Sequence, residues 1–176
     1  MKPIKTVTIL GANGSMGSLC AGIIAAFSNA TVYMIARNID KAQEDVERAI
    51  NSVRSDTIRQ RLNPATYDDL AQCVSESDWI LEAVAEIYEA KESVNRMITR
   101  SRRKGSIVST MSSGLSVEKL SQVFDPDGQE NYFGTHFYNP PYKMLLCELM
   151  SHKKSNTAIK NDLKEYLQTI LMARSQ

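Results

Sequence analysis

The chain has 176 residues, 43% of them hydrophobic, which is enough to build the core of one domain of ordinary size. Its 21 lysine and arginine residues nearly balance its 20 aspartate and glutamate residues, so charge gives no reason to expect nucleic acid as a partner. Three cysteines without a CxxC pair argue against a zinc site or a disulfide framework, and favour a reducing, cytoplasmic location with no bound metal.

Short apolar runs alternate along the chain with longer polar stretches that carry apolar residues three and four apart, and this pattern predicts alternating strands and helices. The first run, TVTIL, is too short for a signal-peptide core or a membrane span, so no membrane partner is expected. The strands are predicted at residues 6–10, 31–36, 78–84, 105–110, 132–137 and 144–149. The helices are predicted at about residues 15–28, 40–60, 87–103, 116–123 and 156–173.

The order of these elements predicts an α/β fold. The first four predicted strands are apolar almost throughout, as expected when helices cover both faces of a parallel sheet. Only residues 138–143 separate the last two, which is too few for a parallel crossover through a helix, so this pair is expected to run antiparallel. The prediction is a Rossmann-type doubly wound sheet, mostly parallel, with an antiparallel strand pair near the C-terminus.

A glycine-rich segment, LGANGSMGS at residues 10–18, follows the first predicted strand directly and opens a helix. Gly11, Gly14 and Gly17 can supply a tight turn, a close approach of the backbone to a pyrophosphate, and close packing of the helix on the strand. The structural alternative is a turn that only joins strand to helix. A phosphate loop for ATP is disfavoured, because no Gly-Lys-Ser/Thr follows.

The helix that follows these glycines begins at Ser15 and Met16, and a helix amino end attracts negative charge. The spacing departs from G-x-G-x-x-G, because Ala12 stands two residues before the middle glycine, but the position after a strand and the helix start agree with that motif. The segment therefore predicts a single dinucleotide-binding domain over residues 1–176.

The end of the second predicted strand bears on the choice of dinucleotide. NAD enzymes usually place an Asp or Glu there to bind the ribose 2′-hydroxyl, whereas this chain has Ala36 followed by Arg37. An arginine at this point can bind a 2′-phosphate instead, so the expected cofactor is NAD or NADP, with Arg37 favouring NADP. The alternative is an arginine that only faces solvent.

Three further segments, DWILEAVAEIYEAK (78–91), SSGLSVEKL (112–120) and GTHFYNPPYKMLLCE (134–148), occur in this order. Together they resemble the NAD-binding, N-terminal domain of the 3-hydroxyacyl-CoA dehydrogenase family, over essentially the whole chain. In the last segment the family's His-Phe-Phe-Asn-Pro motif is HFYNP, with a glutamate at the matching distance. The resemblance implies NAD(P)-dependent hydride transfer between a 3-hydroxyacyl-CoA and a 3-oxoacyl-CoA, in fatty-acid or related acyl-CoA metabolism.

The resemblance also assigns roles to single residues. It makes His136 the catalytic base and Glu148 the acid that orients and polarises it, and imidazole is suited to take a hydroxyl proton as hydride leaves the adjacent carbon. It assigns cofactor or substrate contacts to Ser113, Asn139, Glu86 and Lys91. The structural alternative for the histidine is a buried core residue beside a proline turn, which the glutamate twelve residues later disfavours.

The other assigned residues have plain structural alternatives as well. Ser113 would contact the substrate oxygen and the cofactor, yet serines in such loops commonly form turns or cap helices. Asn139 would contact the nicotinamide, yet Asn-Pro-Pro makes a good turn in any protein. Glu86 and Lys91 would line the ribose side of the cofactor, yet an acid at a helix start also favours the helix dipole, and a lysine is usually solvated.

Two positions depart from the family pattern on the cofactor side: Met111 stands where the family usually has Asn, and Ala36 replaces the acid at the end of the second strand. For the CoA moiety, Arg54, Arg59 and Arg61 are candidates, although a helix with several arginines is usually a solvated face.

The family continues into an all-helical C-terminal domain, which is absent from this chain. We expect either the amino-terminal piece of a longer protein or a naturally short relative, with a homodimer or the missing domain as its partner besides acyl-CoA. On its own, the chain is expected to bind cofactor with little or no turnover, because half of the substrate cleft would be open to water.

Competing functions remain open. A non-catalytic NAD(P)-binding or regulatory module would have the same glycine loop. A short-chain reductase also uses a glycine-rich loop, but no tyrosine here is followed by lysine four residues on. A serine hydrolase is disfavoured, because the chain has no G-x-S-x-G elbow.

Overall fold

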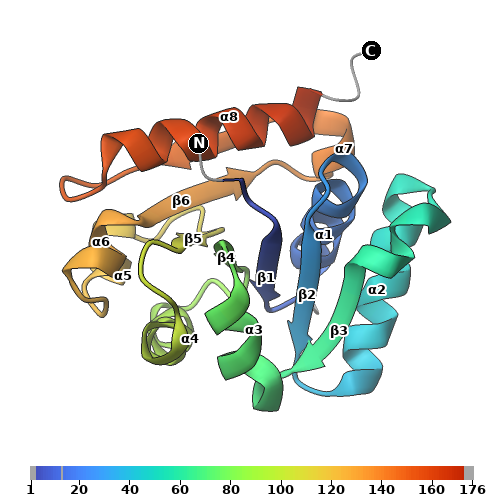
Figure 1. The fold of residues 1–176 in the computed structure, drawn as a ribbon, viewed down its shortest axis with the longest axis horizontal. Helices are drawn as coiled ribbons and strands as arrows, with labels where there is room; N and C mark the ends of the chain where they lie inside the picture. The colour runs from blue at the N-terminus through green and yellow to red at the C-terminus, as the bar shows by residue number, and fades with distance from the viewer. Residues whose placement is uncertain (1–2, 13, 173–176) are drawn as a thin grey trace.

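The computed structural model describes residues 3–12 and 14–172, and they form a seven-stranded sheet in the order β3-β2-β1-β4-β5-β6-β7 (Figure 1). The strands are β1 (Thr6–Leu10), β2 (Thr31–Ala36), β3 (Leu62–Thr66), β4 (Trp79–Glu82), β5 (Ile107–Thr110), β6 (Tyr132–Phe137) and β7 (Cys147–Met150). The first six are parallel, and β7 pairs antiparallel with β6. The predicted doubly wound, mostly parallel sheet with an antiparallel C-terminal pair is therefore confirmed.

The helices connect these strands and cover both faces of the sheet. The longer ones are α1 (Ser15–Phe27), α2 (Ile39–Val53), α4 (Tyr88–Ser101) and α8 (Thr157–Met172). The shorter ones are α3 (Leu70–Glu76), α5 (Val117–Ser121), α6 (Pro126–Glu130) and α7 (Pro141–Met144), with 3-10 turns η1 (Asp56–Arg61) and η2 (Tyr67–Asp69). None of the helices within residues 3–12 and 14–172 is both long and apolar enough to cross a lipid bilayer.

The core is divided into two layers by the sheet. Successive residues of a strand point to opposite faces, so Ile9 packs on the layer formed by α1, α2 and α8, while Leu10 packs on the layer of α3, α4 and α5. Trp79 extends the first layer, where its ring meets the ring of Tyr166 from α8 edge to face at 5.9 Å. Burial on both faces explains why the central strands are apolar almost throughout.

The region after α2 differs from the prediction. The helix predicted over 40–60 ends at Val53, because Arg54 adopts a left-handed conformation with φ of 54° and breaks the helical run. Residues 56–61 then form η1, and residues 62–66 form β3, a strand that was not predicted. The segment LNPAT gives a weak strand signal because it contains Pro64, which a sheet tolerates here since β3 lies at its edge.

Smaller differences occur elsewhere. The last strand is 147–150 rather than 144–149, because Pro141 starts the short helix α7. The strands predicted at 78–84 and 105–110 are shorter, at 79–82 and 107–110, and α3, α6 and α7 were not predicted. The final helix is found at Thr157–Met172, and residue 173 of its predicted range lies outside the described residues.

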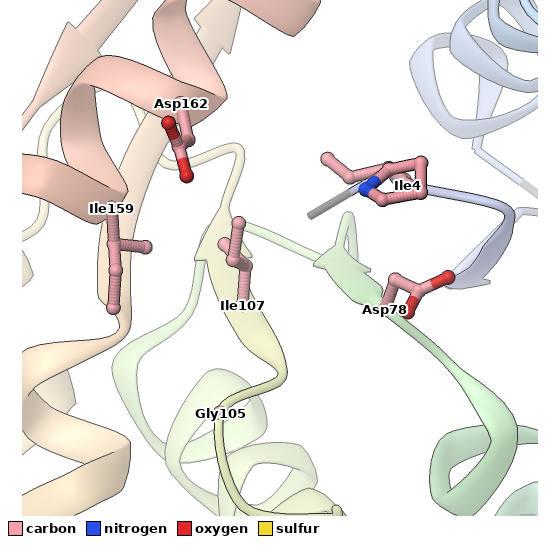
Figure 2. Close-up of a pocket in the computed structure, with 7 residues that line it drawn as sticks. Ile4, Asp78, Gly105, Ile107, Ile159 and Asp162 are labelled. Carbon is pink, nitrogen blue, oxygen red and sulfur yellow. The ribbon is translucent and has the colours of Figure 1, made fainter. Parts of the chain in front are cut away.

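A small cavity of about 80 Å³ lies at the amino ends of the parallel strands, beneath α8 (Figure 2). Asp78 on its wall, just before β4, accepts hydrogen bonds from the backbone N–H groups of Lys5 and Thr6 and pairs with Arg103. These contacts tie the strand starts together. The cavity is therefore part of the structural base of the sheet, at the edge opposite to the glycine loop.

Candidate functional site

Two neighbouring cavities lie at the carboxyl ends of the parallel strands, with volumes of about 330 and 420 Å³. Both are lined by Gly14, Ala83 and Val84, so they meet where α1 begins and β4 ends. In the strand order, β1 leads outward to β2 on one side and lies next to β4 on the other. This is the topological switch point of a doubly wound sheet, where the loops diverge and leave a crevice for a ligand.

The glycine loop is shaped by the closeness of these two strand ends. Gly11 has φ of 79°, and a Cβ atom there would lie 2.8 Å from the backbone of Ala83. A Cβ atom on Gly17 would lie 2.9 Å from Cα of Ala12 and from the Gly11 carbonyl oxygen, so a glycine is needed for helix α1 to lie against the loop. The first and third glycines thus have the structural roles that the sequence pattern predicts.

The amino end of α1 opens onto both cavities. Gly14 is the N-cap residue and lines both of them, while Ser15, Met16 and Gly17 line the smaller one. The first N–H groups of a helix have no partner within it, and the first turn of α1 contains no acidic side chain. This end is suited to a pyrophosphate, and the two cavities joined at Gly14 have the layout that a dinucleotide requires, with one half on each side.

Arg37 lies directly after β2 and lines the larger cavity together with Gly11 and Tyr67. It is exposed and forms no hydrogen bond or ion pair with any residue in the part of the chain that the structure describes. Burial raises the pKa of Tyr67, and the positive charge of Arg37 opposes that shift. The guanidinium of Arg37 is therefore near the cavity wall and available to a ligand.

Glu86 organises the loop that follows β5. It accepts hydrogen bonds from the Ser112 hydroxyl at 2.5 Å and from the backbone N–H groups of Ser113 and Gly114 at 3.0 Å each. Partial burial alone would raise the pKa of Glu86, but these hydrogen bonds and the charge of Lys91 outweigh it and hold the pKa below its usual value. The glutamate therefore stays ionised and holds the loop at the wall of the smaller cavity.

Lys91, which the resemblance assigns to the cofactor, is buried together with Glu82 at the end of β4. Its Nζ donates to both carboxylate oxygens of Glu82, at 2.9 and 3.2 Å, and to the carbonyl of Val84 at 3.1 Å, while Glu86 lies 3.5 Å away. Glu82 also accepts from Thr110 Oγ1 and from the Val84 N–H, both at 2.7 Å. Glu82 was not predicted as a site residue, although its position at the end of an apolar run could have indicated a buried acid.

His136 and Glu148 are brought together by the antiparallel pairing of β6 and β7. They are direct partners across the two strands, and Nδ1 of His136 lies 3.0 Å from Oε2 of Glu148. The hydrogen bond from His136, together with one from Tyr138, holds the pKa of Glu148 below its usual value. A carboxylate can only accept, so Nδ1 carries the hydrogen in this pair, and His136 lines the smaller cavity beside the glycine loop.

The remaining predicted site residues differ in where they lie. Ser113 is exposed and lines the smaller cavity, and its hydroxyl has no hydrogen-bond partner among the residues that the structure describes. Asn139 is exposed and lines neither of the two cavities. Arg59 pairs with Glu47 and Asp56, and Arg61 donates to the carbonyls at the end of α1, so their guanidinium groups are engaged within the chain.

Comparisons with known proteins agree with this geometry. The family model described as the NAD binding domain of 3-hydroxyacyl-CoA dehydrogenase matches residues 6–173. A probable 3-hydroxyacyl-CoA dehydrogenase of Deinococcus radiodurans is 29% identical over 181 residues, which cover 96% of this chain and 51% of that protein. A probable 3-hydroxyacyl-CoA dehydrogenase of Bacillus subtilis is 27% identical over 197 residues, which cover 97% of this chain and 24% of that protein.

Solved structures of dehydrogenases have the same fold. The 3-hydroxybutyryl-CoA dehydrogenase of Escherichia coli matches with a TM-score of 0.84 at 20% identity, over 96% of this chain and 37% of that chain. The (S)-3-hydroxybutyryl-CoA dehydrogenase of Ralstonia eutropha matches with a TM-score of 0.84 at 24% identity, over 96% of this chain and 61% of that chain. The chain thus spans about half, or less, of the length of the curated relatives named above.

Proposed function

The chain belongs to the family of NAD-binding domains of 3-hydroxyacyl-CoA dehydrogenases, and from this premise we propose that it is the dinucleotide-binding domain of an enzyme that interconverts a 3-hydroxyacyl-CoA and a 3-oxoacyl-CoA. The observation that carries the proposal is the pair of His136 and Glu148, whose histidine faces the cavity beside the glycine loop. A binding module would need the loop but not an imidazole held by a carboxylate next to it.

The residues of the site divide the chemistry among them. Nδ1 of His136 is engaged by Glu148, so Nε2 is the atom that takes the proton from the substrate hydroxyl. A bound nicotinamide cofactor would supply the acceptor for the hydride that the carbon bearing this hydroxyl would lose at the same time, as that carbon becomes a carbonyl carbon. Glu148 holds the tautomer and stabilises the imidazolium that results, as a carboxylate does in other acid–base pairs.

Other residues bind and orient in this proposal. The hydroxyl of Ser113 donates a hydrogen bond to the substrate oxygen, from a loop that Glu86 holds in place. Gly14 and the first turn of α1 bind the pyrophosphate. Asn139 keeps its proposed role near the nicotinamide, and its exposure leaves it accessible to a ligand.

Turnover is the decisive test. In the longest natural form of the protein that contains this chain, we expect reduction of acetoacetyl-CoA with a reduced dinucleotide, and a loss of about 10²- to 10⁴-fold in kcat for His136→Ala, because the proton then has no positioned donor or acceptor. The matched control is His152→Gln, since His152 bonds to the Gln129 carbonyl and lines neither cavity at the strand ends. Equal activity of wild type and His136→Ala would refute the proposed chemistry.

For the cofactor, we propose that Arg37 binds the 2′-phosphate of NADP. The support is an exposed guanidinium on the wall of the larger cavity, at a strand end where no acid stands to bind a 2′-hydroxyl. Fluorescence titration should give tighter binding of NADPH than of NADH, and Arg37→Ala should remove the difference.

The control for that titration is Arg100→Ala, which removes the same charge from the exposed last turn of α4. It should leave the preference for NADPH unchanged, because the expected effect depends on contact rather than on overall charge. Equal affinity of the wild type for NADH and NADPH would show that Arg37 does not select the cofactor.

A non-catalytic dinucleotide-binding module is the second candidate. The observation that favours it is the exposure of the acid–base pair, with side chains of His136 and Glu148 exposed by 26% and 51%. The two functions differ in the turnover assay: tight dinucleotide binding without reduction of acetoacetyl-CoA, in the longest natural form, would support the module.

A further inference from the structure

Glu148 has a second partner besides His136. The hydroxyl of Tyr138 donates to Oε1 of Glu148 at 2.9 Å, while Oε2 faces Nδ1 of His136. The two oxygens of the carboxylate are thus each engaged by a different side chain. The rings of His136 and Tyr138 also lie against each other, with centroids 5.2 Å apart.

The arrangement follows from strand geometry. Residues 136 and 138 are two apart on an extended segment, so their side chains point to the same face, and Glu148 is the direct partner of His136 on β7. The pairing continues one step past β6, because the Tyr138 N–H donates to the carbonyl of Leu146. The backbone therefore places the phenol of Tyr138 next to the carboxylate oxygen of Glu148 that does not face His136.

The exposure of the carboxylate gives this contact its importance. Glu148 is half exposed, and a glutamate side chain on a strand surface has several accessible rotamers, which cost free energy to restrict. With His136 as its only partner, the carboxylate of Glu148 would have one oxygen hydrogen-bonded only to mobile water. The carboxylate could then rotate about its side-chain bonds. The Tyr138 hydroxyl occupies that oxygen.

We propose that Tyr138 is a positioning residue for the acid–base pair: its hydroxyl holds one oxygen of Glu148 so that the other oxygen faces Nδ1 of His136. The proposal rests on the proposed function for its catalytic meaning, but the contact itself does not. The matching residue of the His-Phe-Phe-Asn-Pro motif is a phenylalanine, which has no hydroxyl, so the motif itself does not imply this contact.

Tyr138 is not itself an acid in this scheme. Its hydrogen bond to the Glu148 carboxylate raises the pKa of the phenol above its ordinary value, so the phenol keeps its proton at neutral pH. The same bond contributes to the lowered pKa of Glu148, after that from His136. Because the pKa of Glu148 is lowered, its carboxylate keeps the full stabilising effect of these contacts at pH values above its ordinary pKa. That effect is lost as the pH falls through the lowered pKa and the carboxylate is protonated.

The first test measures Glu148 directly. In this chain labelled with ¹³C at glutamate carboxyl groups, the carboxyl resonance of Glu148, assigned with Glu148→Gln, is followed by NMR against pH. Tyr138→Phe should raise the pKa of Glu148 toward its ordinary value, because one donor to the carboxylate is gone. An unchanged pKa would overturn the proposal.

The control is Tyr33→Phe. It removes another tyrosine-to-glutamate hydrogen bond of 2.9 Å, between Tyr33 and Glu76, far along the sheet on β2. The titration of Glu148 should not respond to it. A response of equal size would mean that loss of any such tyrosine hydroxyl perturbs the fold, and the positioning role would be rejected.

The second test uses turnover in the longest natural form of the protein. Tyr138→Phe should lower kcat by roughly two- to tenfold, the size expected for one hydrogen bond, with KM for the acyl-CoA unchanged. In a Glu148→Ala background, which removes both carboxylate oxygens, the same change should have no further effect, because the two residues act through one contact. An effect of Tyr138→Phe that is equally large without Glu148 would overturn the proposal.

The outcomes separate this proposal from the proposed function. Loss of turnover in His136→Ala, with Tyr138→Phe indistinguishable from wild type in both tests, would remove only the role of Tyr138. Absence of turnover in the wild type would remove the proposed function, and the NMR titration would still decide whether Tyr138 holds Glu148.

Discussion

At the scale of single residues, the carboxylates around the cleft are held in contrasting surroundings. Glu82 is fully buried, and Lys91, Thr110 and the Val84 N–H satisfy its oxygens. Glu148 is half exposed and depends on two side chains from β6 and the segment after it. A buried charge without its partner destabilises the fold strongly, whereas an exposed one is screened by water, so the fold depends on the contacts of Glu82 and much less on those of Glu148.

This contrast predicts the effect of removing Lys91. Lys91→Met should lower the free energy of unfolding by about 3–5 kcal/mol, because the Glu82 charge would be left buried and unpaired. Urea denaturation measures the loss. The matched control is Lys41→Met, which breaks the exposed pair with Glu44 and should change stability little. Similar small losses for both variants would contradict the view that the buried pair is needed for folding.

Single residues also differ in how well the sequence predicts them. The spacing between His136 and Glu148 indicates two adjacent strands, and the structure places the two residues opposite each other. The partner of Lys91 was not predicted, because burial of Glu82 depends on helix α4 packing over the strand end, a contact between separate elements. Tyr138 belongs to the HFYNP motif that the sequence shows, but only the structure shows which group its hydroxyl contacts.

At the scale of elements, the segments with strong local patterns were predicted well and the weak ones were missed. β1 and β2 have the predicted bounds, because apolar runs between turn signals define a buried strand. β3 lacks such a run, and its place at the edge of the sheet comes from pairing with β2, with Pro64 opposite Met34. The end of α2 depends on the left-handed conformation of Arg54. An arginine in the sequence does not indicate such a conformation, because residues with a Cβ atom rarely adopt it.

The junction of β1 and α1 yields a prediction at this scale. Gly17→Ala should lower both stability, by about 1–3 kcal/mol, and dinucleotide affinity, because its Cβ atom would lie 2.9 Å from the backbone and push the helix away from the loop. Gly14→Ala is the contrasting variant, since its Cβ atom would meet nothing closer than 3.4 Å within the described residues. Thermal unfolding and NADH titration distinguish the two.

Gly14→Ala should therefore lose less stability than Gly17→Ala, only the small cost of alanine at a helix N-cap, and yet bind the dinucleotide less tightly, because residue 14 lines both cavities. If Gly17→Ala kept both its stability and its affinity, the close packing of helix on loop would not be what positions the binding site.

At the scale of the whole molecule, the proposed cofactor site is assembled from distant parts of the chain. Its walls come from the ends of β1, β2, β4, β5 and β6, and they meet only because the sheet order brings β4 beside β1 and β6 beside β5. The alternation of strands and helices was enough to predict this architecture. The sequence could not show that the two cavities join at Gly14, because that depends on the distance between two strand ends.

The proposed acid–base pair is encoded differently, and this has a consequence for how such a site can change during evolution. His136, Tyr138 and Glu148 all lie within residues 136–148, where the pairing of β6 with β7 and its extension to Tyr138 set the distances between them. Recombination could transfer this stretch in one step with its internal geometry intact, whereas the cofactor walls can be inherited only together with the entire sheet. The proposed proton-transfer residues and the proposed dinucleotide site can thus be inherited separately within one fold.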